Sequence, residues 1–151
     1  MRFCLVLLTG LSLAACSDTA SPTLSANRVF AHSLNGEWAT TIAPPGQSLD
    51  LLLRADGATI HATGSFSAGQ TTGTVLGSGT VTWRDDEFVP AGRIIPAHSD
   101  LDMNLDYSDG RTAYLNQARV TDDTLQAALT FTTSTATSTT AISYFTEFVR
   151  K

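Results

Sequence analysis

Three adjacent residues, His98, Ser99 and Asp100, have the side-chain types of a hydrolytic relay, in which a carboxylate orients a histidine that activates a serine. Neighbouring residues of an extended segment point to opposite sides, so three consecutive side chains do not converge on one another. The sequence also lacks a Gly-x-Ser-x-Gly nucleophile elbow, a phosphate-binding loop and a dinucleotide fingerprint. We therefore expect no catalytic residues and do not expect an enzyme.

The three histidines are the first candidates for metal ligands. His32, His61 and His98 are far apart, and none has a second histidine or a cysteine at the spacing of a zinc site. His61 falls on the polar face of an alternating segment, where solvation explains it. The sequence therefore predicts no metal site and no cofactor.

A short acidic stripe deserves comparison with a calcium loop. Asp102, Asn104 and Asp106 match the first three ligand positions of such a loop. However, Tyr107 replaces the required glycine, and Ala113 stands where a glutamate is needed. Alternate residues of a strand lie about 6.6 Å apart, which is too far to surround one ion. We interpret the stripe as a solvated outer face.

The N-terminus carries the pattern of an export signal. Arg2 precedes an apolar run over residues 3–13, which is shorter than the roughly 20 residues that a membrane-spanning helix needs. The sequence Leu13-Ala14-Ala15-Cys16 follows, and it resembles the lipobox of bacterial lipoproteins. The resemblance implies that residues 1–15 are a signal peptide and that Cys16 is lipidated, which anchors the protein to a membrane. The alternative is an ordinary secretory signal that leaves Cys16 as a chance cysteine.

The residues around Cys16 support the same interpretation. The only other cysteine, Cys4, lies in the leader, so Cys16 has no disulfide partner. The residue after Cys16 is Ser17 and not an aspartate. In this respect the chain resembles those diderm lipoproteins that are sent to the outer membrane, where they face the periplasm. Residues 16–29 are mostly small and polar, and they predict a flexible tether.

Length and charge limit the remaining possibilities. A chain of 151 residues has room for one domain after the leader, and we assign that domain to residues 30–151. The formal net charge is -5, and the nine basic residues form no cluster. Because nucleic-acid binding needs a basic stripe, we exclude nucleic acid as a partner.

The domain reads as a series of β-hairpins. Apolar and polar residues alternate on both sides of Asp56-Gly57, and the same pattern precedes Asp109-Gly110. Period-two alternation around an Asp-Gly pair is a strong hairpin signal. With the other alternating segments, the sequence predicts about eight strands and no convincing helix. The expected fold is all-β, a single antiparallel up-and-down barrel.

The first of these strands contains a short motif that supports a barrel. Gly36-Glu37-Trp38 resembles the Gly-x-Trp signature of lipocalins and related calycins. In that superfamily a basic residue near the end of the last strand packs over the tryptophan, and Arg150 has this position here. Avidin-like barrels resemble the chain about as well. The alternative is that Trp38 is a core residue of an unrelated fold.

One connection is longer than a hairpin needs. Residues 85–98 include Phe88, Ile94 and Ile95, which we predict to cap a barrel mouth or to contact a partner. The alternative is a loop that packs its apolar residues against the barrel.

Two functional hypotheses follow. The first is an envelope lipoprotein that binds or carries a small apolar ligand or lipid inside the barrel, with room left by small inward residues such as Ala62, Gly64, Gly77, Gly79 and Ala127. The second is a non-catalytic interaction or structural module with a filled barrel, since eight-stranded barrels are usually filled by side chains. The state of the interior distinguishes the two.

Overall fold

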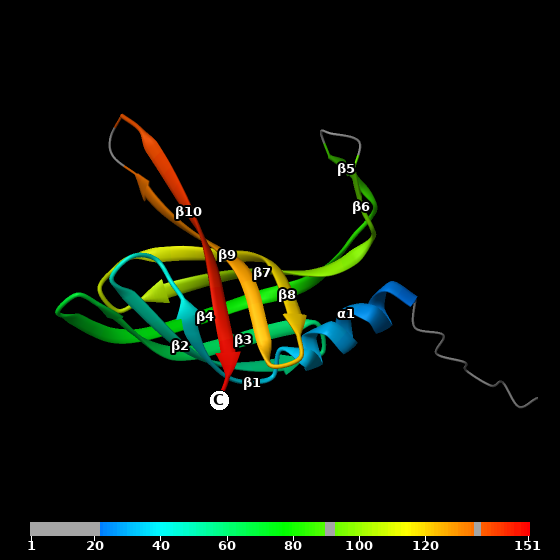
Figure 1. Ribbon diagram of the computed structural model, residues 1–151, viewed down its shortest axis with the longest axis horizontal. Helices are drawn as coiled ribbons and strands as arrows, with labels where there is room; N and C mark the ends of the chain where they lie inside the picture. The colour runs from blue at the N-terminus through cyan, green and yellow to red at the C-terminus, as the bar shows by residue number, and fades with distance from the viewer. Residues whose placement is uncertain (1–21, 90–92, 135–136) are drawn as a thin grey trace, which may run out of the picture.

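The computed structural model describes residues 22–89, 93–134 and 137–151. Among these residues, eight strands form a closed antiparallel barrel, and each neighbours its successor in the chain (Figure 1). The prediction of a single all-β up-and-down barrel is therefore confirmed. In chain order the elements are α1 (Pro22–Ser33), β1 (Gly36–Ile42), β2 (Gln47–Asp56), β3 (Thr59–Ala68), β4 (Thr71–Arg84), β5 (Glu87–Val89), β6 (Arg93–Ile95), β7 (His98–Tyr107), β8 (Thr112–Thr121), β9 (Thr124–Ser134) and β10 (Thr139–Arg150).

The two Asp-Gly pairs turn the chain as predicted. Gly57 and Gly110 have φ angles of 63° and 89°, a left-handed conformation that glycine adopts without steric cost. The barrel closes where β1 pairs with β10, with Trp38 opposite Arg150 in the register. Closure removes the unpaired edges that an open sheet of these strands would expose.

The helix α1 differs from the sequence interpretation, which assigned residues 16–29 to a flexible tether. Residues 22–29 instead belong to this helix, and residues 16–21 lie outside the described residues. Pro22 suits a first helical turn because its φ is already helical. Asn27 and Ala31, one turn apart, are buried as α1 packs against β4 and β7. Tertiary packing therefore stabilises a helix that the mostly polar sequence does not predict.

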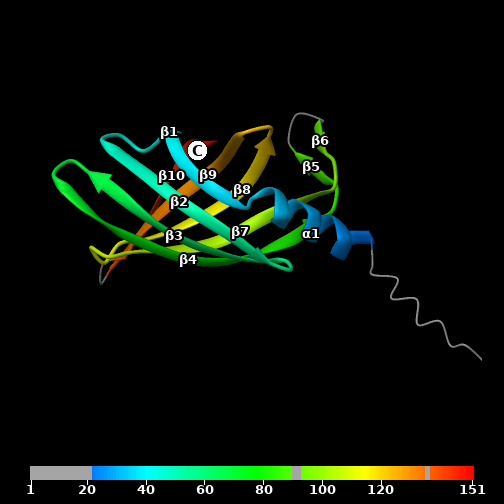
Figure 2. The same cartoon turned by 90° about the horizontal axis from the view of Figure 1, so that it is seen from below.

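The helix lies across one end of the barrel (Figure 2), which we call the helix end. The opposite end, where the β1–β2, β3–β4 and β7–β8 loops lie, we call the loop end. No helix in the described part of the chain is long and apolar enough to cross a membrane.

Two hairpins project from the barrel wall. The predicted loop at residues 85–98 contains the small β5–β6 hairpin, with Phe88 opposite Ile94, and it rises near the helix end (Figure 1). The β9–β10 hairpin extends toward the loop end, because β1 pairs only with residues 147–150 of β10. Residues at the bases of both hairpins line one hollow on the outer surface.

Candidate functional site

The helix end of the barrel is closed around Trp38. The guanidinium carbon of Arg150 lies 4.3 Å from the centre of the Trp38 ring, which is the cation–π contact that the lipocalin resemblance implied. The ring nitrogen of Trp38 donates a hydrogen bond to the Leu34 carbonyl at 2.8 Å. Arg150 also donates to the carbonyls of Ser33 and Asn35. These bonds tie the last strand to the residues that end α1.

The structure explains why glycine occupies the first position of the Gly-x-Trp motif. Gly36 has a φ of 135°, and a Cβ atom there would lie 2.6 Å from Nη1 of Arg150. A side chain at this position would therefore displace the guanidinium from the tryptophan ring.

The loop end is closed by a second arginine, which the sequence analysis missed. The Arg111 guanidinium carbon lies 5.1 Å, 5.0 Å and 5.6 Å from the ring centres of Phe66, Tyr107 and Phe131. Its Nε donates to Asp109 at 2.8 Å. The three rings come from β3, β7 and β9, so no local sequence pattern marks the cluster. Both ends of the barrel are thus covered by an arginine on aromatic rings.

The aromatic cluster changes the acidity of one of its members. Burial raises the pKa of Tyr107 to about 12, and the nearby positive charge of Arg111 opposes this only in part. The Tyr107 ring lies 5.1 Å from that of Phe66 and 5.7 Å from that of Phe131, measured between ring centres. The phenol therefore stays neutral over the whole physiological range.

Apolar side chains fill the interior between the two arginines. The largest fully buried residues include Trp38, Phe148, Met103 and leucines from β2, β7, β8 and β9. The glycines that were expected to leave room do not, since a Cβ at Gly77 would lie 2.6 Å from the Leu105 side chain. A Cβ at Gly79 would lie 2.3 Å from the Asp102 carbonyl oxygen. The small residues bring strands close together instead of enclosing a cavity.

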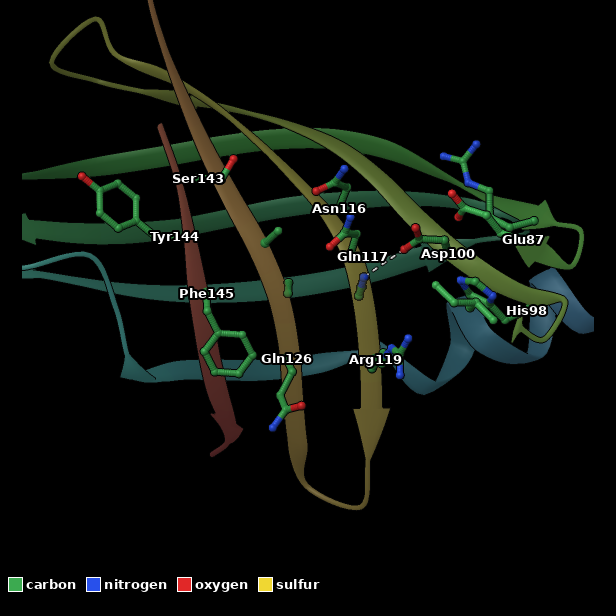
Figure 3. Close-up of a pocket in the computed structure, with 15 residues that line it drawn as sticks. Glu87, His98, Asp100, Asn116, Gln117, Arg119, Gln126, Ser143, Tyr144 and Phe145 are labelled. Carbon is green, nitrogen blue, oxygen red and sulfur yellow. Dashed lines mark hydrogen bonds between the residues drawn. The ribbon is translucent and has the colours of Figure 1, made fainter. Parts of the chain in front are cut away.

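The concave outer surface between the projecting hairpins holds a groove of about 740 Å³, which we call the outer groove (Figure 3). Its floor is the outer face of β8, β9 and β10, and its wall is the base of the β5–β6 hairpin. Polar and charged side chains line much of it: Arg84, Glu87, His98, Asp100, Asn116, Gln117, Arg119, Gln126 and Ser143. Phe145 supplies an aromatic ring at the β10 side, while the Tyr144 ring points to the opposite side of the strand and lies 6.3 Å from that of Phe131.

A bulge in β8 shapes this groove. The pairing of β8 with β9 shifts between Asn116 and Arg119, and Gln117 has a φ of 54°. This left-handed conformation is uncommon for a residue other than glycine, asparagine or aspartate. Bulges often re-aim a side chain at a functional site, and here Gln117 lines the groove.

The carboxylate of Asp100 supports the bulge from the neighbouring strand. Asp100 is buried, and its Oδ1 accepts the backbone N–H groups of Leu101 at 2.8 Å and Ala118 at 2.9 Å. The pairing of β7 with β8 ends at Met103 and Leu115, before the bulge, so this carboxylate takes the place of a ladder carbonyl for Ala118. Asp100 therefore has a structural task at the groove.

The residues resembling a hydrolytic relay have separate partners. His98 bonds through Nδ1 to the Pro96 carbonyl at 2.9 Å, and Ser99 donates to the Asn27 side chain at 2.8 Å. Asp100 accepts only backbone groups in the bonds described above. The three side chains therefore bond to different parts of the chain.

Of the acidic stripe on β7, Asp102 is bonded within the protein, while Asn104 and Asp106 are exposed. Asp102 accepts hydrogen bonds from Arg84 and Tyr114, both at 2.5 Å. Burial and this hydrogen bond to Asp102 raise the pKa of Tyr114 to about 12. Within the described residues, no group of three or more histidine, cysteine, aspartate or glutamate side chains gathers to hold a metal ion.

The other residues selected from the sequence are placed as follows. Phe88 and Ile94 face each other across the β5–β6 hairpin and are 74% and 63% exposed. Ile95, at the base of this hairpin, lines the outer groove. Cys16 lies outside the described residues.

No protein-family model matches the sequence, and no curated protein and no solved structure matches it either. Function is therefore inferred from the sequence and from the residues of the site.

Proposed function

We propose that this protein is a lipoprotein of the bacterial cell envelope, anchored to the outer membrane through lipidated Cys16 and facing the periplasm. We further propose that it is a non-catalytic binding module, in which a filled, lipocalin-like barrel acts as a rigid scaffold for the outer groove. The observation that carries this proposal is the combination of an interior packed with side chains and a strained bulge residue, Gln117, exposed in a groove outside.

We favour the interaction module over a carrier of apolar ligands. A carrier needs an entrance and an enclosed volume of about 300 Å³ or more for a small molecule. Here Arg150 and Arg111 cover the two barrel ends, and large apolar residues occupy the space between them. A ligand can bind at the outer surface without displacing core side chains, because a concave site already exists there.

The lining of the outer groove favours a polar ligand with ring-shaped units, and we propose an oligosaccharide. Carboxamides both donate and accept hydrogen bonds, which suits the hydroxyl groups of a sugar, and three of them line the groove: Asn116, Gln117 and Gln126. Phe145 is 56% exposed and lies beside Gln126 (Figure 3). A sugar ring places its apolar face on such an aromatic ring while its hydroxyl groups reach the amides.

The anchor is tested by the mass of the N-terminal peptide from protein expressed whole in a bacterium. We expect cleavage before Cys16 and a mass increase that corresponds to diacylglycerol, with or without a further acyl chain. In the Cys16→Ser variant this increase and membrane retention should both be lost. An unmodified Cys16 in the wild-type protein would refute the anchor.

The groove is tested by NMR titration with a trisaccharide of N-acetylglucosamine. We expect saturable shifts of the side-chain amides of Asn116, Gln117 and Gln126. Replacing Phe145→Ser or Gln126→Leu should weaken binding about tenfold, the cost of one lost contact of about 1.4 kcal/mol. The control is Asn104→Ala, on the exposed outer face of β7 away from the groove, and it should bind normally. Absence of shifts with this and other oligosaccharides would contradict the ligand class.

A further inference from the structure

Four exposed apolar side chains lie at the helix end of the molecule. Leu24 and Val29, on α1, are 51% and 68% exposed, and Phe88 and Ile94, on the β5–β6 hairpin, are 74% and 63% exposed. Figures 1 and 2 both place the start of α1 and this hairpin near one end of the barrel, and the end of β9 and the start of β10 near the other. Their exposure in one region distinguishes them from apolar residues scattered singly over a surface.

The surface between α1 and the hairpin is also apolar. A groove of about 770 Å³ separates α1 from residues 95–99 and from the end of β8. Its apolar lining includes Val29, Phe30, Ile95 and Pro96. Helix, groove and hairpin base therefore form one continuous surface, which we call the apolar end face.

The charges near this face balance one another. The four arginines at this face, Arg28, Arg84, Arg93 and Arg119, are matched by four acids: Asp85, Asp86, Glu87 and Asp102, the last of which is paired with Arg84 at 2.5 Å. All of them except Asp102 are exposed. A face without net charge is neither drawn to anionic headgroups nor repelled by them, so it suits a zwitterionic lipid surface.

The position of the anchor indicates what covers the face. Cys16 precedes the first residue of α1 by six residues, which span at most about 20 Å when fully extended. Lipidated Cys16 would thus hold the start of α1 close to the bilayer. We propose that the apolar end face rests in the interfacial layer of the membrane, with Val29, Phe88 and Ile94 among the lipid headgroups.

This inference rests on the anchor of the proposed function and adds a defined orientation to it. The barrel axis would point away from the membrane, and the loop end would face the periplasm. Amphipathic surfaces bind such interfaces by burying apolar side chains to a shallow depth. The outer groove, which opens from the side of the barrel, would stay accessible.

The test uses single-cysteine reporters in the full chain, expressed and processed in a bacterium. Acylation blocks the thiol of Cys16, and Cys4 is removed with the leader, so a cysteine introduced at Ile94→Cys is the only free thiol. The matched control is Ile142→Cys, because Ile142 is 50% exposed on the β9–β10 hairpin away from the helix end. Both variants are labelled with the environment-sensitive dye NBD and reconstituted in vesicles of phosphatidylcholine.

We expect the emission of the dye at position 94 to shift to the blue, to become brighter and to be quenched by doxyl-labelled lipid. The dye at position 142 should keep the emission that it has in water. Adding Val29→Ser and Phe88→Ser to the Ile94→Cys variant should reverse these changes. An equal response at both positions, or a dye at position 94 that remains in water, would overturn the orientation if the mass of the N-terminal peptide shows acylated Cys16. An unmodified Cys16 would instead refute the anchor, and the orientation with it.

Discussion

At the scale of single residues, Arg150 and Arg111 have the same structural role, which is to cover the core at opposite ends of the barrel. Each places a guanidinium on aromatic rings and uses its N–H groups for hydrogen bonds within the protein. A flat cation with an apolar face suits a barrel end, since it covers the core and still meets water at its edge. The two arginines therefore separate the interior from the surroundings.

Replacing Arg150→Met should lower the free energy of unfolding by about 2 kcal/mol, because one cation–π contact and hydrogen bonds to two backbone carbonyls are lost. Urea denaturation of the variant measures this change. The control is Arg54→Met on the exposed side of β2, for which we expect a change within about 0.5 kcal/mol. Equal stability of the two variants would show that Arg150 does not hold the barrel end.

Gln117 allows the backbone and side-chain contributions of one residue to be separated. Gln117→Gly should raise the free energy of unfolding by about 0.5–1 kcal/mol, because glycine relieves the left-handed strain, and it should weaken oligosaccharide binding because the carboxamide is removed. Asp122→Gly is the matched control, since Asp122 has a φ of 51° outside the groove. It should leave binding unchanged. A Gln117→Gly protein that binds as tightly as the wild type would remove Gln117 from the site.

The raised pKa of Tyr107 predicts that the folded protein loses stability at alkaline pH. Its pKa is about 12 in the folded protein, against 10.0 for the unperturbed side chain. Between these values the unfolded chain releases the proton while the folded chain keeps it, so the free energy of unfolding falls as pH rises from 10 to 12. At 1.36 kcal/mol per pKa unit the full effect is about 3 kcal/mol.

The comparison that isolates this effect is denaturation of the wild type and of Tyr107→Phe at several pH values between 9 and 11.5. The variant keeps the aromatic ring but has no phenol to ionise, so its stability should fall less steeply with pH. Parallel curves for the two proteins would contradict the assignment.

Sequence reasoning at this scale succeeded only where a local motif existed. Trp38 and Arg150 were paired because Gly36-Glu37-Trp38 resembles the Gly-x-Trp signature of lipocalins and Arg150 lies near the end of the last predicted strand. The Arg111 cluster was missed, because its rings come from three strands separated by tens of residues. Gln117 was also missed, since a bulge depends on the register of two strands and not on the composition of one.

At the scale of elements, β8 depends on a side chain from β7 to keep its bulge. Asp100→Ala should cost about 2–3 kcal/mol, because two backbone N–H groups lose their acceptor. Hydrogen exchange of the Ala118 amide should accelerate beyond the change expected from stability alone. Asp106→Ala, on the exposed face of the same strand, should have little effect. Protection of Ala118 that survives in Asp100→Ala would show that the bulge is held otherwise.

The barrel strands were predictable because a half-buried strand alternates apolar and polar residues, and because Asp56-Gly57 and Asp109-Gly110 mark tight turns. The β5–β6 hairpin was read as a loop, since strands of three residues are too short to show alternation. The helix α1 was interpreted as a tether over residues 22–29, because this part of the sequence is mostly small and polar and because Ser, Thr and Asn have low helix propensity. Its contacts with β4 and β7 decide the outcome.

At the scale of the whole molecule, the closed barrel followed from the sequence but the state of its interior did not. Gly64, Gly77 and Gly79 raised the expectation of spare volume, yet the structure uses them for close approach between strands. A missing side chain leaves a cavity only when the neighbours stay in place, and here they do not. The outer groove depends on the β5–β6 hairpin and on a bulge in β8, which the sequence did not reveal.

The central claim is that the barrel interior is filled and sealed, and one methyl group tests it directly. Met103 is fully buried in the interior, and Met1 is the only other methionine in the chain. We predict that the ¹³C-labelled methyl resonance of Met103 is single and stays in place when palmitate or another apolar ligand is titrated into the protein. A saturable shift or a second resonance for Met103 would show that a ligand enters the barrel, and would contradict the account.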